Sequence, residues 1–244
     1  MISAVILAGG LGTRLRSAMP DLPKPMAPIN GRPFLEYQLD YWIAQGINRF
    51  VLSVGYRHQV IINHFGNSYK GVGLDFVIEQ APMGTGGGLL LATEKVGNNT
   101  PFLLLNGDTY FAADLKALTE FAQANDADWC FSLFCTNEEG RYMGMDVTPQ
   151  GQITSLKSGT GQPGRLANGG VYWVHPRALD SKFSSGDKVS LEDDIFPAAM
   201  ASGQRLFGIE FTGTFIDIGV PDDYHRAPAL LAAQNKWAND FSRS

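Results

Sequence analysis

The feature that most limits the fold is a regular alternation of short apolar runs and amphipathic stretches over the first 135 residues. Residues 3–8 (SAVILA) have the length and composition of a buried strand, whereas residues 33–46 carry apolar side chains at helical spacing and end at a glycine. Further strands are predicted at residues 50–55, 74–80, 101–108 and 128–135, and further helices at 58–65, 84–96 and 113–124. This alternation favours an α/β fold with a doubly wound, mixed but mostly parallel sheet.

The pattern changes after about residue 136. Short strands separated by Gly, Pro and Asn turns are predicted at residues 143–149, 151–159 and 168–176. The remaining predicted elements are a helix at 190–202, a strand at 205–211 and a C-terminal helix at about 221–238. We therefore expect a single domain over residues 1–244, with a small β-rich excursion from the main sheet.

Composition argues against several classes of protein. The net charge of −5 and the pI near 5.3 give no basic field for a nucleic-acid backbone. No run approaches the roughly 18 apolar residues of a membrane span, and the first apolar run is too short for a signal peptide. Cys130 and Cys135 would point to opposite faces of one strand, so we expect two buried free thiols. A cytoplasmic protein without nucleic-acid or membrane partners is expected, and a homo-oligomer stays open.

A glycine-rich loop follows the first predicted strand. It contains the residues Ala8, Gly9, Gly10, Gly12 and Thr13. In an open α/β sheet, ligands bind beyond the carboxyl ends of the strands, where glycines let backbone N–H groups approach phosphate oxygens. Arg14 and Lys24 would add cationic contacts to a triphosphate. The dinucleotide and Walker patterns are both absent, because residue 15 is leucine and no Gly-Lys-Ser/Thr occurs. The glycines alone fit an ordinary tight turn as well as a phosphate-binding loop, so both interpretations stay open.

Two aspartates are predicted at the carboxyl ends of strands. Asp108 closes the strand at 101–108, and Asp217 lies between a strand and the C-terminal helix. A phosphate-bound Mg²⁺ is the natural partner of carboxylates at this edge of a sheet. A lone aspartate at a strand end is more often a turn residue or a helix cap, so the positions alone leave the metal undecided.

Taken together, the motifs resemble those of the sugar-1-phosphate nucleotidyltransferase family. GGLGTRL at residues 9–15, followed by Lys24-Pro25 and Gly31-Arg32-Pro33, is similar to the family signature. EQAPMGTGG at 79–87 looks like the family's second nucleotide-facing segment, and NGGVY at 168–172 like its strand beside the hexose. The resemblance implies a Rossmann-like fold of the nucleotide-diphospho-sugar transferase type. Its nucleotide half would cover about residues 1–135 and its sugar-side half about 136–220.

The resemblance also implies a role for individual residues. The expected catalytic residues are Arg14 and Lys24, which would contact the triphosphate, and Asp108 and Asp217, which would hold Mg²⁺. The nucleotide is expected to contact Ala8, Gly9, Gly10, Gly12, Thr13, Gln80, Pro82, Gly84, Thr85 and Gly107. The sugar phosphate is expected to contact Gly144, Lys157, Asn168, Gly170 and Glu192. Arg165 is an alternative to Lys157 as the cation that binds the phosphate. Glu192 could equally be an acidic residue that only stabilises the first turn of its helix.

The implied reaction transfers a nucleotidyl group from a nucleoside triphosphate to a sugar 1-phosphate and releases pyrophosphate. The runs LPKPMAPINGRPFLEYQLDYW, PMGTGGGL and SLEDDIFP look most like D-glycero-alpha-D-manno-heptose 1-phosphate guanylyltransferases, which implies GTP as donor and GDP-heptose as product. Mannose-1-phosphate guanylyltransferases and glucose-1-phosphate uridylyl- and thymidylyltransferases share the loop and stay open. A cytidylyltransferase acting on a non-sugar phosphate and a non-catalytic nucleotide-sugar sensor are further alternatives.

Overall fold

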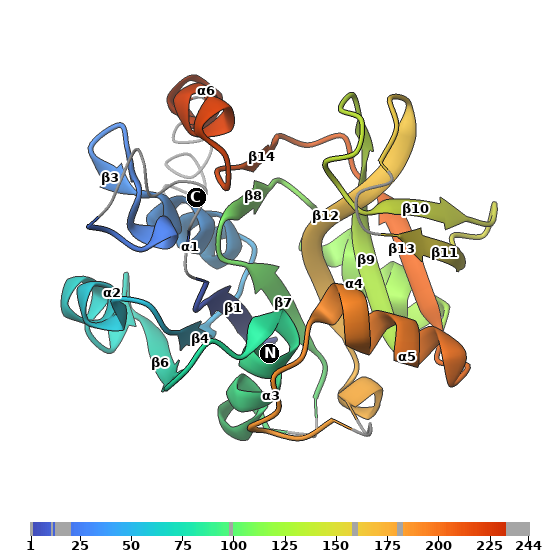
Figure 1. The fold of residues 1–244 in the computed structure, drawn as a ribbon, viewed down its shortest axis with the longest axis horizontal. Coiled ribbons are helices and arrows are strands. Elements are labelled where there is room, and N and C mark those ends of the chain that lie inside the picture. The colour runs from blue at the N-terminus through green and yellow to red at the C-terminus, as the bar shows by residue number, and fades with distance from the viewer. Residues whose placement is uncertain are drawn as a thin grey trace.

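The computed structural model describes residues 2–10, 12, 21–97, 100–157, 161–179 and 183–232. Through these ranges runs a ten-stranded mixed sheet in the order β11-β10-β12-β7-β1-β4-β6-β5, in which β9 also pairs with β12 and β13 pairs with β9. In Figure 1 the strands β1, β4 and β6 lie on the left and the β9–β13 group on the right, with β7 and β12 between them. The predicted mixed α/β sheet with helices is confirmed.

The parallel part of the sheet consists of β6 (Val72–Ile78), β4 (Arg49–Val54), β1 (Ala4–Ala8) and β7 (Phe102–Asn106), in that spatial order. The side chains of β1, β4 and β7 are buried on both faces, as their continuous apolar sequence predicts, whereas β6 buries only Leu74 and Val77. All four strands point the same way, so the loops that follow them meet at one edge of the sheet.

The rest of the sheet is mostly antiparallel. The long strand β12 (Arg165–Val174) pairs antiparallel with β7 and with β9 (Trp129–Thr136), and β13 (Leu206–Glu210) runs parallel to β9. Two short strands, β10 (Gly144–Val147) and β11 (Ile153–Lys157), complete this side as an antiparallel pair. Strand 128–135 was predicted to be central, and β9 does lie between β12 and β13.

Helices cover both faces of the sheet, and each face has its own apolar core. One core contains side chains from α1 (Phe34–Ala44), α2 (His58–Phe65), α4 (Leu115–Ala124) and α6 (Pro221–Ala232). The other contains side chains from α3 (Gly84–Val96) and α5 (Phe196–Ala201). Strand β1 serves both cores by alternation, because Ala4 and Ile6 belong to the first and Val5 to the second. Every helix in the described ranges is too short or too polar to cross a membrane.

The helix boundaries differ slightly from the sequence prediction. Helix α4 begins two residues late, because Asp114 caps it by accepting a hydrogen bond from the Ala117 N–H at 2.7 Å. The helix expected at 190–202 begins with a π-helical turn, Leu191–Ile195, before α5. The predicted C-terminal helix is described as far as Ala232, and its expected last residues lie outside the described ranges.

Several short elements were not predicted at all. They are the 3₁₀ turns Lys24–Met26 and Pro176–Leu179 and the strands β2 (Pro28–Ile29), β3 (Arg32–Pro33), β5 (Ser68–Tyr69) and β8 (Thr109–Phe111). The strand predicted before the C-terminal helix, with Asp217 at its end, is β14 (Phe215–Asp217). Strands β8 and β14 form a separate antiparallel pair in which Asp217 lies opposite Thr109. This pair matters for function, because it brings the segment before α6 to the end of β7.

The prediction for one cysteine was wrong. Cys130 is a buried free thiol, as expected, but Cys135 is exposed. The two side chains do fall on opposite faces of β9. Helix α5 packs through Phe196 against Trp129 and Phe131 near the start of the strand, and this cover ends before Cys135.

Candidate active site

A cleft with a volume of about 550 Å³ opens at the carboxyl edge of the parallel strands. It is lined by Leu7, Ala8, Gly9, Gly10, Gly12, Lys24, Pro25, Glu79, Pro82, Gly84, Thr85, Asn106, Gly107, Asp108, Thr109 and Asp217. The structure thus gathers eight of the ten residues predicted to contact the nucleotide. Gln80 is exposed and lines a smaller neighbouring hollow of about 280 Å³ instead, because the chain turns after Glu79. Thr13 and Arg14 lie outside the described residues.

Glycine is required where the end of β7 passes the end of β1. The Gly107 N–H donates a hydrogen bond to the Leu7 carbonyl at 3.0 Å. A Cβ on Gly107 would lie 2.4 Å from that same carbonyl oxygen, so a side chain there would force the two strand ends apart. Asp108 is thereby held directly beside the glycine-rich loop.

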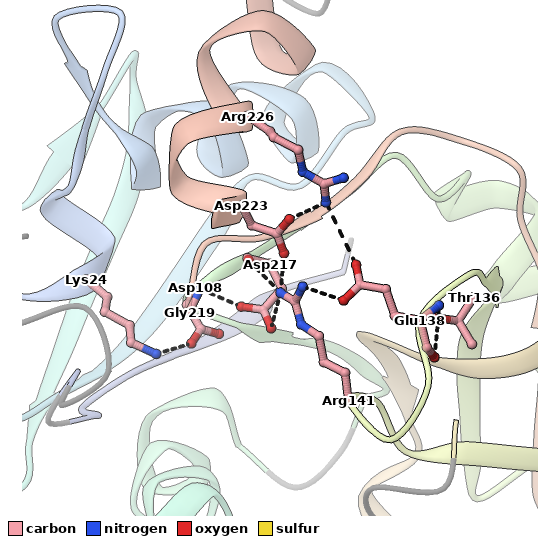
Figure 2. A network of polar contacts seen from close by, with 9 residues as sticks. All are labelled: Lys24, Asp108, Thr136, Glu138, Arg141, Asp217, Gly219, Asp223 and Arg226. Atoms are coloured by element: carbon pink, nitrogen blue, oxygen red, sulfur yellow. Dashed lines mark hydrogen bonds and ion pairs between the residues drawn. The ribbon is translucent and has the colours of Figure 1, made fainter. Parts of the chain in front are cut away.

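Lys24 and Asp108 form an ion pair at the floor of the cleft. The Lys24 Nζ lies 2.9 Å from Asp108 Oδ2, and the Lys24 side chain is only 14% exposed. Lys24 is the first residue of a 3₁₀ turn and follows Pro23. The fixed backbone angle of Pro23 restricts the direction in which the chain enters this turn. The cation predicted for the triphosphate is therefore held against the first predicted metal ligand (Figure 2).

Asp217 reaches the same place from the other half of the chain. The β8–β14 pair and a hydrogen bond of 2.9 Å from the Ile218 N–H to the Asp108 carbonyl hold the two segments together. The Gly219 N–H donates to Asp217 Oδ1 at 2.6 Å.

The close grouping of the charged atoms is visible at Gly219. A Cβ built there would lie 2.7 Å from Asp217 Oδ1. It would also lie 3.2 Å from Lys24 Nζ and 3.5 Å from Asp108 Oδ2. Two carboxylates and one ammonium group thus surround a single point (Figure 2).

The environment of Asp217 disfavours its charge. Burial and, after it, the negative charge of Asp108 raise the pKa of Asp217 to about 6, against the opposing effects of the Gly219 N–H, Arg141 and Lys24. An added cation would relieve the repulsion between the two carboxylates. Within the described ranges no group of three or more His, Cys, Asp or Glu side chains could hold a metal. An oxygen-only pair that leaves further positions to phosphate and water fits Mg²⁺, which rarely takes a full set of protein ligands.

This shift predicts an unusual pH dependence of stability. Because the folded-state pKa of Asp217 lies above its ordinary value of 3.8, its stabilising contribution is complete at low pH and is lost as the pH rises through about 6. In EDTA, the free energy of unfolding of the wild-type protein should fall by on the order of 1–2 kcal/mol between pH 5 and pH 8, relative to that of Asp217→Asn. Thermal melts of both proteins test this, with the exposed Asp222→Asn as control. Parallel curves for wild type and Asp217→Asn would show that Asp217 ionises normally.

Arg141 is a site residue that sequence reasoning missed. Its Nη1 lies 2.8 Å from Glu138 Oε2, and its Nη2 lies 3.6 Å from Asp217 Oδ2 and donates to the Asp217 carbonyl at 3.2 Å. Arg141 also pairs with Asp223, which is 2% exposed and is shared with Arg226 on α6 (Figure 2). The only local signal is an arginine after two glutamates in a turn-like stretch, which does not indicate partners 76 and 82 residues away.

Another hollow, distinct from the one beside Gln80 but also of about 280 Å³, adjoins the cleft on the sugar side predicted from the sequence. It is lined by Asn106, Thr109, Arg141, Tyr142, Met143, Asn168, Gly169, Gly170, Glu192, Phe215 and Asp217. Asn168, Gly170 and Glu192, three of the residues predicted to contact the sugar phosphate, thus lie in one place. Glu192 accepts a hydrogen bond from Thr85 Oγ1 at 2.8 Å, which links this hollow to the cleft.

The other residues predicted for the sugar phosphate lie elsewhere among the described residues. Gly144 and Lys157 are opposite each other in the β10–β11 pair, and neither lines this hollow. Arg165 pairs with Asp146 at the surface. Their contacts with a sugar phosphate stay predictions, and Arg141 is the cation that the structure places at the hollow.

Comparison with known proteins agrees with this geometry. The model of a family described as nucleotidyl transferase matches residues 3–234. The chain is 39% identical to D-glycero-alpha-D-manno-heptose 1-phosphate guanylyltransferase of Aneurinibacillus thermoaerophilus, over 94% of this chain and 98% of that protein. It is 37% identical to the enzyme of the same name from Campylobacter jejuni, over 92% and 97% of the two chains.

A solved structure is also similar over nearly the whole length. HddC from Yersinia pseudotuberculosis, crystallised in complex with GMP-PN, matches with a TM-score of 0.82 and 34% identity. The match covers 94% of this chain and 99% of that one. Together with the cleft, the ion pair and the two carboxylates, the family match over residues 3–234 establishes that this chain belongs to the nucleotidyl transferase family.

Proposed function

We propose that the protein transfers a guanylyl group from GTP to D-glycero-alpha-D-manno-heptose 1-phosphate, which gives GDP-heptose and pyrophosphate. The observation that carries the reaction type is the grouping of Lys24, Asp108 and Asp217 at the floor of a glycine-lined cleft. The choice of base and sugar is supported by the two relatives that carry this enzyme name and match nearly the whole chain. The nucleotide would occupy the cleft, and the sugar would occupy the hollow beside Glu192.

The chemistry needs little from acid–base groups. A phosphate monoester has a second pKa near ~6, so the sugar phosphate is largely a dianion at neutral pH and can attack the α-phosphorus without a general base. Attack requires in-line placement and neutralisation of charge. Mg²⁺ held by Asp108 and Asp217 would supply Lewis-acid stabilisation of the phosphate oxygens at the point of reaction. Lys24, and Arg14 as the sequence implies, would hold the β- and γ-phosphates and stabilise the departing pyrophosphate.

The sugar side would orient the acceptor. The Glu192 carboxylate is fixed by Thr85 and by the Ser190 hydroxyl at 3.1 Å, which leaves acceptor capacity for sugar hydroxyls. Asn168 is fixed in turn, because its amide donates to the Tyr172 hydroxyl at 2.8 Å and its Oδ1 accepts from the Gly170 N–H at 3.0 Å. Side chains whose rotamers are already fixed lose little entropy when they bind a ligand.

A substrate panel tests the proposal. The purified protein would be incubated with Mg²⁺, with each of GTP, UTP, dTTP, CTP and ATP, and with heptose, mannose or glucose 1-phosphate, while pyrophosphate release is followed. We expect kcat/KM to be highest for GTP with the heptose phosphate, at least about tenfold above any other pair. A preference for mannose 1-phosphate would show that the proposed sugar is wrong, and a preference for another triphosphate would show that the proposed base is wrong. Binding of GTP without turnover on any pair would favour a nucleotide-sugar sensor.

A further inference from the structure

A glutamine is buried on the helix that contacts the end of β7. Gln38 lies in the middle of α1, is 1% exposed and has no part in the reaction proposed above. A polar side chain buried to this extent opposes folding unless hydrogen bonds replace its contacts with water. Among the described residues its Oε1 has no hydrogen-bond partner, so packing alone does not account for an amide at this position.

The Gln38 amide donates to the backbone on both sides of a two-residue turn. Its Nε2 donates to the Asn106 carbonyl at 2.8 Å and also to the Thr109 carbonyl. Asn106 is the last residue of β7 and Thr109 is the first of β8, so the turn between them is Gly107-Asp108. Both partners are acceptors, which fixes the orientation of the amide and uses both hydrogens of Nε2.

Two backbone hydrogen bonds hold the same turn from other directions. The Gly107 N–H donates to the Leu7 carbonyl at 3.0 Å, which ties the turn to β1. The Asp108 carbonyl accepts from the Ile218 N–H at 2.9 Å, which ties the turn to the segment that carries Asp217. The amide from α1 adds an attachment on the side of the helix layer. Attachments from three elements define the position of a carboxylate more closely than the end of one strand does.

Resting on the proposed magnesium-dependent transfer, we infer that Gln38 is a positioning residue, which holds the Gly107-Asp108 turn so that Asp108 and Asp217 can share one Mg²⁺. Gln38 acts through Asp108, because its own side chain lines neither the cleft nor the two hollows. Without the amide, two backbone carbonyls beside the turn would lose their donor, and the turn would shift to regain hydrogen bonds. A misplacement of about 1 Å is enough to lower a reaction rate by ~100-fold.

Variants with one donor and with no donor at this position separate the hydrogen bonds from the packing. Gln38→Met fills a similar volume and has no donor. Gln38→Glu keeps the shape, and as a neutral acid, the form that burial favours, it donates to one carbonyl. Gln45→Met is the matched control. Gln45 follows the last residue of α1, and its amide also holds the backbone, since it donates to the Ala113 carbonyl at 3.2 Å and accepts from the Leu115 N–H at 2.7 Å.

The first readout is the gain in GTP affinity that Mg²⁺ provides, which is the Kd for GTP in EDTA divided by the Kd in Mg²⁺. Isothermal titration calorimetry measures both values without sugar phosphate, so turnover does not contribute. We expect Gln38→Met to reduce this gain by at least about tenfold, the scale for a residue that orients a metal ligand, and Gln38→Glu to reduce it less. Gln45→Met should keep the gain within about twofold of wild type, even if its Tm falls.

The second readout is the separation of kcat from KM. A displaced Asp108 acts on charge that develops during the reaction, so kcat in Gln38→Met should fall by at least about tenfold. The KM for the heptose phosphate should stay within about threefold of wild type. Raising the Mg²⁺ concentration should restore part of the lost rate. A general loss of structure would lower the fraction of active protein and would not respond to Mg²⁺ in this way.

Three outcomes would overturn the inference while leaving the proposed function intact. One is a folded Gln38→Met protein that keeps the wild-type gain from Mg²⁺. Another is an equal loss of this gain in Gln45→Met, which would show that any damage to α1 has the same effect. If Gln38→Met does not fold, a wild-type gain in Gln38→Glu is the third. A wild-type protein whose GTP affinity and turnover do not respond to Mg²⁺ would instead contradict the proposed metal site itself.

Discussion

Replacing either Asp108 or Asp217 by asparagine is expected to lower turnover by at least about 100-fold. Each substitution keeps the shape of the side chain but removes one of the two negative charges beside Lys24. The loss should appear in kcat with GTP and the heptose phosphate at saturating Mg²⁺, because both carboxylates act on the developing charge.

The stability of these variants separates a catalytic loss from a folding defect. Burial and Asp108 already disfavour the charge on Asp217, so Asp217→Asn should be at least as stable as wild type in EDTA at pH 8. Asp222→Asn, an exposed aspartate in the first turn of α6, should keep wild-type turnover. Near-wild-type rates in both Asp108→Asn and Asp217→Asn would contradict the metal assignment.

Removing the Arg141 guanidinium is expected to cause the largest loss of stability. Asp223 is 2% exposed, and in Arg141→Met its carboxylate would lose the more buried of its two arginine partners. Breaking a buried ion pair from one side costs about 3–5 kcal/mol, because a charge is left in a poorly solvated place. For a domain of this size we expect the Tm to fall by about 6 °C or more.

Arg226→Met is the matched control for this prediction. Arg226 pairs with the same carboxylate, but its side chain is 60% exposed, so its removal should cost less than about 1 kcal/mol. The double variant Arg141→Met with Asp223→Asn should recover part of the lost stability, because the unpaired charge is gone. Equal costs for the two arginine variants, or no recovery in the double variant, would show that the Arg141–Asp223 pair contributes no special stability.

The predictable part of the site is the part encoded by neighbouring residues. The strand that ends at Ala8, the glycines after it and Asp108 at the end of an apolar run all lie within local patterns of about ten residues. Parallel strands place their carboxyl ends at one edge, so these segments could be assigned to one ligand site before their geometry was known. Eight of the ten predicted nucleotide residues lie in the cleft for this reason.

The choice between adjacent residues could not be made in the same way. Gln80 was predicted to contact the nucleotide, yet Glu79 is the side chain that lines the main cleft. In an extended segment, neighbouring side chains point to opposite sides, and the exact end of β6 decides which of them enters the cleft. Cys135 illustrates the same limit, since its burial depends on where α5 stops covering β9.

The sequence by itself determined the α/β architecture, the glycine-rich loop and the identity of the charged residues, because hydrophobic period, glycine and charge are local properties. Only the tertiary structure decided how Asp217 meets Asp108 and how Arg141 meets Asp223. Strands β8 and β14 have three residues each, too few for a period, and they pair across more than 100 residues of chain. Such a pair forms only because the strands that precede its two members, β7 and β13, are already held in the sheet. Its partners therefore follow from the packing of the whole molecule and not from either segment alone.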